Sequence, residues 1–279
     1  MKNRTSNTQT IKEHPVSAHE VTTEISGPIA RIAIHRPERK NSLTPSVCLE
    51  LVEALKTISE NEEVRVLIFG SNERGFCAGA DLLQSLSEIP RGEDANLHGF
   101  IDDHYHALIR SLFSLSIPTI AAVRGGAVGF GFSLALACDF RIVATEAKVG
   151  PVFTRIGLVP DGGCTFFLTN LLGVGKAMEL IYAGKRFDGP TAVELGLAYE
   201  HVADAQVDEA ATALATTLAQ GPPLANAQIR HLVYSNNGAP LDEALDREAR
   251  AQAKQLVTAD VAEGVMAFLE KRAPNFKGR

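Results

Sequence analysis

The sequence lacks the cysteine patterns that mark zinc proteins and disulfide-stapled secreted domains. Its four cysteines, Cys48, Cys77, Cys138 and Cys164, include no CxxC pair and stand among apolar residues or glycines. We therefore expect free, buried thiols in a reducing compartment, which favours a cytoplasmic protein.

An excess of basic residues and a long apolar run are also missing. The formal net charge is -6, whereas a nucleic-acid-binding domain normally carries a basic face. No apolar run reaches the roughly 18 residues that a membrane span requires. Residues 1–16 are polar, lack the apolar segment of a secretory signal, and are interpreted as a flexible tail. We therefore expect neither nucleic acid nor a membrane as a partner.

Three common catalytic or nucleotide-binding motifs are absent as well. The glycines at 126, 129 and 131 have the reverse of the spacing that binds dinucleotides, and no P-loop is found. No GxSxG elbow surrounds Ser133, so we expect its hydroxyl to bond a backbone carbonyl inside an apolar helix. Nicotinamide chemistry, phosphoryl transfer through a P-loop and a serine nucleophile are therefore disfavoured.

The pattern of apolar residues predicts an α/β core followed by helices. Residues 19–36 alternate as a β-hairpin does, residues 45–60 have helical spacing, and residues 64–70 form an apolar strand, which implies a parallel crossover. After residue 204 about four helical segments follow, the first three separated by breaks that contain glycine and proline. We predict a tail at 1–16, a core at 17–205 and a helical C-terminal region at 206–279.

Two glycine-rich turns, at 75–83 and 125–131, each follow a buried strand and precede a helix. Glycine lets the backbone come close to a ligand, and the first amides of a helix have no acceptor within it. Either turn alone could be a tight connection, and Asp81 reads as a helix N-cap. Both turns together, with Asp161 following in the loop at 157–163, favour an oxyanion hole beside one acid. The alternative for Asp161 is a turn or N-cap residue.

A cluster of Asp102, Asp103, His104 and His106 lies on the helix predicted for residues 97–113. Such residues can bind a metal, but no flanking ligands complete a set. We interpret the cluster as a solvated helix face and expect no metal site.

Several motifs together resemble the crotonase, or enoyl-CoA hydratase/isomerase, superfamily. They are IHRPERKNSL (34–43), GFCAGADL (75–82), IAAVRGGAVGFGFSLALACDFRIV (120–143), GLVPDGG (157–163) and the terminal EGVMAFLEKRAPNFKGR (263–279). The resemblance covers roughly residues 19–279, in order and at the spacing of the family. It implies a ββα-spiral core, a homotrimer or hexamer formed through the C-terminal helices, and an acyl-CoA thioester as substrate, with no separate cofactor.

Matching motif to motif, the resemblance assigns the site residues. The thioester oxygen would accept hydrogen bonds from the amides of Ala78 and Phe130. The remaining substrate contacts that it implies are Arg36, Lys40, Gly79, Ala80, Asp81, Leu82, Phe153, Phe268 and Lys271, the last two commonly reaching the CoA of a neighbouring subunit.

The sequence departs from the hydratases of this superfamily at both of their catalytic glutamates. Ser133 and Phe153 occupy those positions, so Asp161 is the remaining acid, and apolar walls around it would raise its pKa. This resembles the branch of ring-1,2-epoxyphenylacetyl-CoA isomerases of phenylacetate degradation and Δ3,Δ2-enoyl-CoA isomerases of fatty acid metabolism. The function expected is double-bond isomerisation with Asp161 as proton shuttle. The alternatives are an enoyl-CoA hydratase, which is a lyase, or a catalytically silent CoA-ester binding protein.

Overall fold

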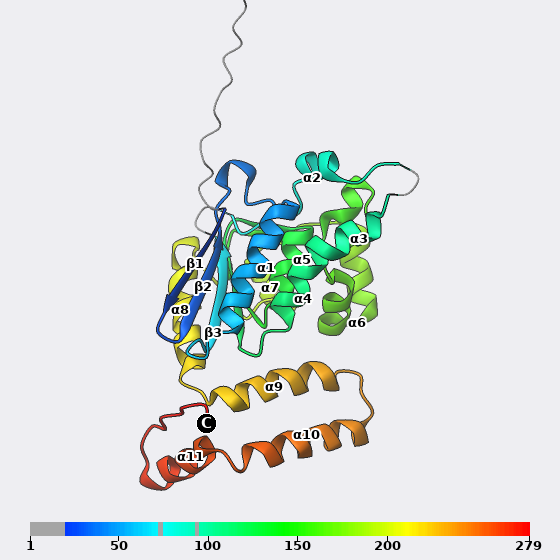
Figure 1. Cartoon of the computed structure of the whole chain (residues 1–279). Helices are drawn as coiled ribbons and strands as arrows, with labels where there is room; N and C mark the ends of the chain where they lie inside the picture. Colours follow the sequence, from blue (N-terminus) through cyan, green and yellow to red (C-terminus); the bar gives the residue numbers. More distant parts are fainter. Residues whose placement is uncertain (1–19, 72–74, 93–94) are drawn as a thin grey trace, which may run out of the picture.

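The structure is a computed structural model that describes residues 20–71, 75–92 and 95–279. The predicted tail at 1–16 lies outside these residues. Figure 1 shows a sheet with helices on both faces and a pair of long helices, α9 and α10, set apart from it.

The main sheet has six strands in the order β1-β2-β3-β4-β6-β8. Only the first pair is antiparallel, and every later pair is parallel. The strands are β1 (Val21–Ser26), β2 (Ile29–Ile34), β3 (Val66–Ser71), β4 (Thr119–Val123), β6 (Phe140–Ala144) and β8 (Glu200–Val202). A second, two-stranded sheet pairs β5 (Gly126–Val128) with β7 (Lys148–Gly150) in parallel. The hairpin predicted across Gly27 and Pro28 is confirmed.

The helices of the core are α1 (Pro45–Ser59), α2 (Leu82–Glu88), α3 (Leu97–Ile101), α4 (Ala107–Phe113), α5 (Phe130–Leu136), α6 (Cys164–Ala183), α7 (Gly189–Glu194) and α8 (Val207–Ala219). Of these, α1 packs against β1 and β2, and α8 packs against β2, β3, β4 and β6. Short 3-10 turns are η1 (Pro37–Arg39), η3 (Val152–Ile156) and η4 (Asp204–Gln206), and η2 (Asp102–His106) is a π-helical turn between α3 and α4. Helix α1 starts at the predicted Thr44-Pro45 signal, because the Thr44 hydroxyl accepts a hydrogen bond from the Val47 amide.

The first helix of the predicted C-terminal region belongs to the core. Val207, Ala211, Ala215 and Ala219 form one buried stripe of α8, which packs against β3, β4 and β6. This differs from the predicted boundary at residue 205. The alanine stripe has the helical period but gives no sign of which surface it covers.

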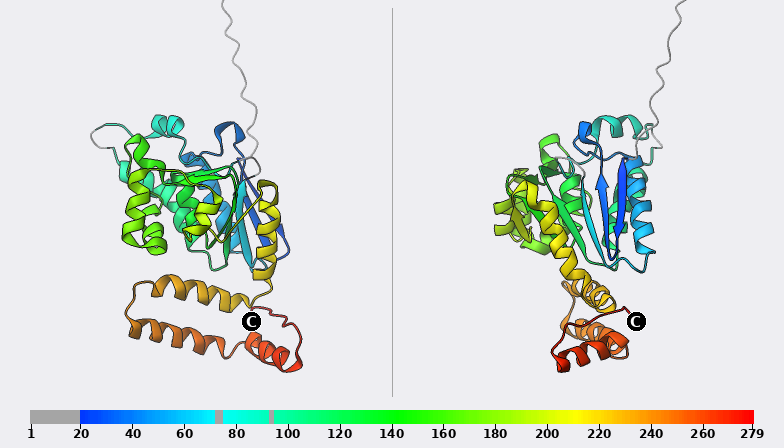
Figure 2. Two further views of the ribbon diagram at one scale, coloured as in Figure 1. Left: turned by 180° about the vertical axis from the view of Figure 1, so that it is seen from behind. Right: turned by 90° about the vertical axis from the view of Figure 1, so that its left-hand side faces the viewer.

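The helices that stand apart from the sheet are α9 (Pro223–Asn236), α10 (Leu241–Gln255) and α11 (Ala259–Glu270). The break at Gly221 and Pro222 precedes them, and both views in Figure 2 place them at one end of the molecule. The buried Asp260 accepts hydrogen bonds from the amides of Lys277 and Gly278, so the end of the chain is fastened to α11.

Helix α6 is the one described helix that is long and apolar enough to cross a membrane by length and composition. Gly173 interrupts it with φ 74° and ψ 164°, values that no α-helix contains.

Candidate functional site

The two glycine turns meet as one backbone junction. Cys77 forms a parallel bridge with Ala127, in which its amide donates to Gly126 and its carbonyl accepts from Val128. A Cβ atom placed on Gly131 would overlap the Cys77 carbonyl oxygen, and one on Gly79 would lie 2.9 Å from the Val128 carbonyl oxygen. The glycines are therefore required because two main chains touch here.

The two amides expected to bind an oxyanion differ in their partners. Phe130 is the first residue of α5, so its amide has no acceptor within the helix. The Ala78 amide donates to the Lys40 carbonyl at 3.1 Å. Lys40 and its neighbour Asn41 both have φ 53°, a left-handed conformation that residues with a side chain adopt rarely. An oxyanion bound here would have to replace the Lys40 carbonyl as the acceptor of the Ala78 amide.

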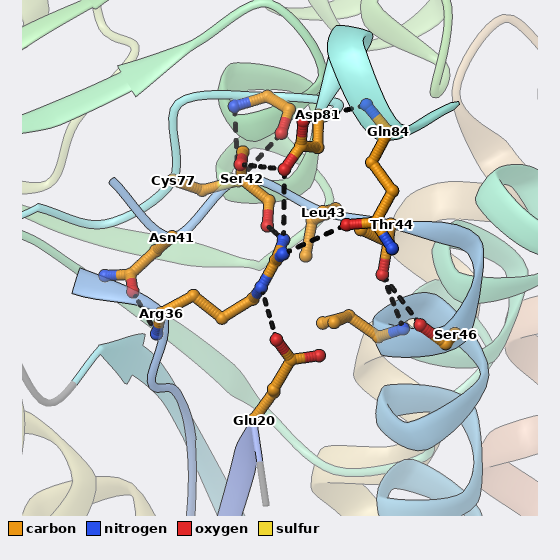
Figure 3. Close-up of polar contacts among 12 residues, drawn as sticks. Glu20, Arg36, Asn41, Ser42, Leu43, Thr44, Ser46, Cys77, Asp81 and Gln84 are labelled. Atoms are coloured by element: carbon orange, nitrogen blue, oxygen red, sulfur yellow. Dashed lines mark hydrogen bonds and ion pairs between the residues drawn. The ribbon is translucent and has the colours of Figure 1, made fainter. Parts of the chain in front are cut away.

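Arg36, expected to lie near the nucleotide of CoA, has its guanidinium turned into the protein (Figure 3). It donates to Glu20 Oε1 at 2.6 Å and to the Ser42 carbonyl at 2.5 Å, and it pairs with Asp81 Oδ2 at 3.5 Å. The side chains of Arg36 and Asp81 are 6% and 7% exposed. This geometry gives Arg36 a structural role and leaves the exposed Lys40 as the better candidate for a phosphate contact.

Asp81 caps α2, as expected from the sequence. Its Oδ1 accepts a hydrogen bond from the Gln84 amide at 3.3 Å, and its Oδ2 accepts one from the Ser42 hydroxyl. The segment of Gly79 and Ala80 is joined to Leu43 by backbone hydrogen bonds, while Leu82 is 41% exposed. The segment predicted to line CoA therefore combines a fixed backbone with an exposed apolar side chain.

Asp161 lies in the loop before α6 and is held against α5. Its carbonyl accepts a hydrogen bond from the Ser133 hydroxyl at 2.9 Å, as expected for a hydroxyl that bonds a backbone carbonyl. A Cβ on Gly162 would come within 2.8 Å of the Phe130 ring and 2.9 Å of Ser133 Cβ. Close packing at Gly162 therefore fixes Asp161 beside the start of α5.

The Asp161 carboxyl group is shielded and has one oxygen without a hydrogen bond. Its Oδ1 is buried and has no hydrogen-bond partner among the described residues. The N-cap residue of α6 is Gly163, and no side chain caps that helix, so the alternative of Asp161 as an N-cap is not supported. The alternative of a turn describes its backbone, because the Asp161 carbonyl accepts a hydrogen bond from the Cys164 amide at 3.1 Å. Burial raises the pKa of the Asp161 carboxyl to about 6, and His106 acts in the opposite direction.

Aromatic rings surround the same region. Phe130 and Phe153 are buried, and Phe153 lies next to Gly129. Phe132 packs edge-on against Phe187, with ring centroids 5.9 Å apart. Of these rings, that of Phe130 lies against the Asp161 loop at Gly162, so it contributes apolar surface beside the carboxyl group.

Phe268 and Lys271, on and just after α11, lie at the end of the molecule opposite α2 (Figures 1 and 2). The Phe268 side chain is 82% exposed. Within one chain the structure therefore does not bring these two residues to Ala78 and Asp161.

The histidine and aspartate cluster on the helix from 97 to 113 only partly forms a solvated face. Asp103 is exposed, but the His106 Nε2 atom is buried without a hydrogen-bond partner. Within the described ranges, no three His, Cys, Asp or Glu side chains gather as metal ligands would. Sequence reasoning missed that one ring nitrogen of His106 is buried, although the side chain as a whole is 36% exposed.

Comparisons with known proteins agree with this geometry. The model of the enoyl-CoA hydratase/isomerase family matches residues 24–279. The enoyl-CoA hydratase domain-containing protein 2 of Mus musculus is 40% identical, over 91% of this chain and 87% of its own length. The 1,2-epoxyphenylacetyl-CoA isomerase of Escherichia coli is 34% identical, over 93% of this chain and 98% of its own length.

Solved structures show the same fold. The crystal structure of enoyl-CoA hydratase from Bacillus anthracis superposes with a TM-score of 0.88 at 32% identity, covering 94% of this chain and all of that one. The backbone junction, the inward acid and these matches lead to one conclusion: the chain belongs to the enoyl-CoA hydratase/isomerase family of the crotonase superfamily.

Proposed function

We propose that the protein is an acyl-CoA double-bond isomerase in which Asp161 carries the proton. The observation that supports this most strongly is the Asp161 carboxyl group, which is buried, has an unpartnered oxygen and has a pKa raised to about 6. A base near neutral pKa both takes and returns a proton readily. The two glutamate positions of the hydratases hold Ser133 and Phe153, which cannot exchange protons at neutral pH.

The proposed reaction needs only one base. The thioester oxygen of a 3-enoyl-CoA accepts a hydrogen bond from the Phe130 amide and replaces the Lys40 carbonyl at the Ala78 amide. Asp161 removes a proton from C2, which leaves a dienolate whose negative oxygen is stabilised by the two amides. The protonated carboxyl then returns that proton to C4, and the double bond moves into conjugation with the thioester.

The competing function is hydration of a 2-enoyl-CoA, the activity in the names of the mouse and Bacillus anthracis proteins. Absorbance of the conjugated thioester separates the two, because isomerisation of a 3-enoyl-CoA creates it and hydration of a 2-enoyl-CoA removes it. Growth of absorbance with a 3-enoyl ester and no loss with a 2-enoyl ester would support the proposal. The reverse pattern would establish a hydratase.

Asp161→Asn tests the assigned base. We expect a loss of roughly 10²- to 10⁴-fold in kcat, while the CoA ester still binds in calorimetry. Asp103→Asn is the matched control, since Asp103 is an exposed acid of the helical segment at 97–113 and should leave turnover unchanged. An active Asp161→Asn enzyme would refute the role. Binding by the wild type with no turnover and no α-proton exchange in deuterated water would indicate a silent binding protein.

A homotrimer or hexamer is also proposed. Phe268, Leu269 and Val257 are 82%, 67% and 86% exposed on or beside α11, and large apolar side chains in such a group mark an interface. Assembly would let a neighbour supply Phe268 and Lys271 to the CoA. Light scattering of the purified protein measures this directly, and a monomer at micromolar concentration would exclude it.

A further inference from the structure

The helices α9, α10 and α11, here called the arm (residues 223–270), join the core through the short linker 220–222 and stand at one end of the molecule (Figure 2). None of the residues of α9, all of which the structure describes, is buried. The apolar side chains of Ile229 and Val233 are 56% and 65% exposed. Apolar burial therefore contributes little to where α9 lies on its own core.

Two polar side chains of α9, one helical turn apart, reach the core instead. The Arg230 Nε atom donates to both oxygens of the Asp139 carboxylate at 3.0 Å, and its Nη1 atom donates to the carbonyls of Phe113 and Leu115 at 2.6 and 2.8 Å. The Tyr234 hydroxyl donates to Asp139 Oδ1 at 2.8 Å. The side chains of Arg230 and Asp139 are only 10% and 13% exposed, so water screens this contact weakly.

Asp139 is itself anchored in the sheet. It precedes β6, and its Oδ2 accepts hydrogen bonds from the amide and the hydroxyl of Thr119, the first residue of β4, at 2.8 and 3.1 Å. The Asp139 amide donates in return to the Thr119 hydroxyl oxygen at 2.9 Å. Asp139 is therefore a fixed anchor, and movement at this contact is movement of α9.

The contact between α9 and the core is strong but incomplete. The Arg230 guanidinium lies over the rings of Phe113 and Tyr234, 5.4 and 5.1 Å from their centroids, yet its Nη2 atom is buried without a hydrogen-bond partner among the described residues. Cavities of about 440, 430 and 290 Å³ border the contact, and Tyr234 lines each of them. A few polar groups thus hold a helix over loosely filled space, so the contact can open without disturbing the core.

Hydrogen bonds also join the helices of the arm to one another. Arg247 of α10 donates to the Ser235 carbonyl at 2.7 Å, and the side-chain amide of Gln255 donates to the Leu224 carbonyl at 3.4 Å. These bonds tie α9 and α10 together near both ends. The position of α9 therefore sets that of α11, which follows α10 after residues 256–258.

A second tie between the core and the end of the chain lies beside the linker. Arg65, just before β3, donates to the carbonyls of Ala219 and Phe276 at 3.2 and 2.9 Å. It holds the base of the arm at the end of α8, about two helical turns before Arg230. Because a helix fixed only at its base can swing, the direction of the arm depends on Arg230 and Tyr234.

We propose that Arg230 and Tyr234 latch α9 to Asp139 and are positioning residues for CoA binding in trans, because they set the direction in which α11 reaches a neighbouring subunit. The inference rests on the proposed assembly, in which Phe268 and Lys271 contact the CoA of a neighbour. With the latch closed, the CoA ester gains these contacts without the cost of ordering the arm. With the latch open, the arm samples several directions and the ester binds more weakly. Proton transfer at the reacting carbons is the same in both states.

Hydrogen exchange of the full-length protein, followed by mass spectrometry, tests the latch. Arg230→Met removes the cation, and Arg250→Met is the matched control, because Arg250 lies in the same arm and pairs with Asp246 at 2.8 Å on an exposed face. We expect faster deuterium uptake in residues 223–270 of Arg230→Met, with β3 and β4 as protected as in the wild type, and wild-type uptake throughout Arg250→Met. Arm uptake that stays unchanged in Arg230→Met, or that rises equally in β3 and β4, would overturn the latch.

Turnover of a 3-enoyl-CoA separates positioning from chemistry. In Arg230→Met the KM should rise about tenfold with kcat within about twofold, and Arg250→Met should match the wild type. Tyr234→Phe keeps the ring and loses one hydrogen bond, so its KM should rise by about two- to threefold. A lowered kcat with an unchanged KM would indicate a merely structural role and overturn the proposal. If Arg230→Met does not fold, Tyr234→Phe decides both measurements.

Phe268→Ala tests the step to the neighbouring subunit. If the latch acts through α11, Phe268→Ala should raise the KM of the wild type and have little further effect in Arg230→Met, whereas independent sites would give multiplied effects. Multiplied effects, or no effect of Phe268→Ala in the wild-type background, would overturn the role of the latch in CoA binding.

Failure of the proposed function would be recognised separately. A wild type that turns over no 3-enoyl ester would end the proposed isomerase function, and the calorimetric Kd of the CoA ester would then replace KM. A monomeric wild type would end the proposed assembly and the role in trans with it, while hydrogen exchange would still decide whether Arg230 and Tyr234 hold the arm.

Discussion

The Arg36 guanidinium and the Asp161 carboxyl group are two shielded charged groups with opposite hydrogen-bonding states. Around Arg36 the guanidinium reaches Glu20, Asp81 and the Ser42 carbonyl, and Asp81 also accepts from Gln84 (Figure 3). At Asp161, by contrast, the buried Oδ1 atom has no hydrogen-bond partner among the described residues.

This difference in hydrogen bonding distinguishes a charged group with a structural role from one that is available for chemistry. A buried charge whose hydrogen bonds are all made stabilises one arrangement of the chain and is a poor ligand, because a new partner must displace an old one. A buried acid with a free oxygen is destabilising but available for chemistry.

The largest effect on stability is expected at the satisfied cluster. Arg36→Met removes the cation but leaves Asp81 and Glu20 in place, so the free energy of unfolding should fall by about 3–5 kcal/mol. Arg250→Ala is the control, because its pair with Asp246 is on an exposed helix face and should contribute little to stability. Urea denaturation at one protein concentration measures both. Equal, small losses would mean that the Arg36 cluster is not structural.

Neutralising Asp161 should raise the free energy of unfolding, whereas removing the Arg36 cation should lower it. The pKa of its carboxyl is about 6 in the folded protein, above the ordinary value of 3.8, so the ionised form is disfavoured by folding at neutral pH. Asp161→Asn should therefore raise the free energy of unfolding at pH 7 to 8, by at most about 3 kcal/mol. The gain should shrink as the pH falls through 6 and vanish near pH 4. An Asp161→Asn variant that is less stable than the wild type at pH 7 would show that the ionised Asp161 carboxyl group stabilises the fold, contrary to this prediction.

One added methyl group should disturb the backbone junction, where the two glycine turns touch at Gly131 and Cys77. Gly131→Ala would press its Cβ into the Cys77 carbonyl and should cost about 1–3 kcal/mol of stability, together with turnover. Gly175→Ala, in α6 with no atom within 4 Å, should be neutral or slightly stabilising. Thermal unfolding and the isomerase assay compare the two variants. A fully active Gly131→Ala would show that the two main chains need not touch.

The smallest expected effect is the pH dependence of kcat in the wild-type protein. Because Asp161 must be ionised to take a proton, kcat should fall below the pKa of about 6, to roughly a tenth at pH 5. Assays between pH 5 and 8 with a 3-enoyl ester measure it. A flat profile over this range would show that another group is the base.

Local features were predictable where short-range rules decide them. The Gly27-Pro28 hairpin, the start of α1 at Thr44 and the N-cap at Asp81 each depend on residues within a few positions. The Ser133 hydroxyl bonds backbone carbonyls, as expected for a hydroxyl inside an apolar helix. The family motifs are likewise visible in the sequence, and the matches to known proteins confirm them.

Other features depend on partners that are distant in the chain. The burial of α8 against the sheet, the Lys40 carbonyl on the Ala78 amide and the burial of His106 Nε2 carry no local signal. The π-helical turn η2 is likewise absent from an α-helical reading of residues 97–113.

The glycines at the junction, much of the order of helices and strands, and the family of the chain could be read from the sequence, because periodicity and turn chemistry act over a few residues. Which buried charges are paired depended on the fold. Arg36 and Asp161 both stand in motifs of the family, yet the Arg36 guanidinium is surrounded by acceptors, whereas Asp161 Oδ1 has no partner among the described residues. Hydrogen-bond satisfaction and desolvation depend on neighbours that folding brings from far along the chain, so the role of each charge followed from the fold.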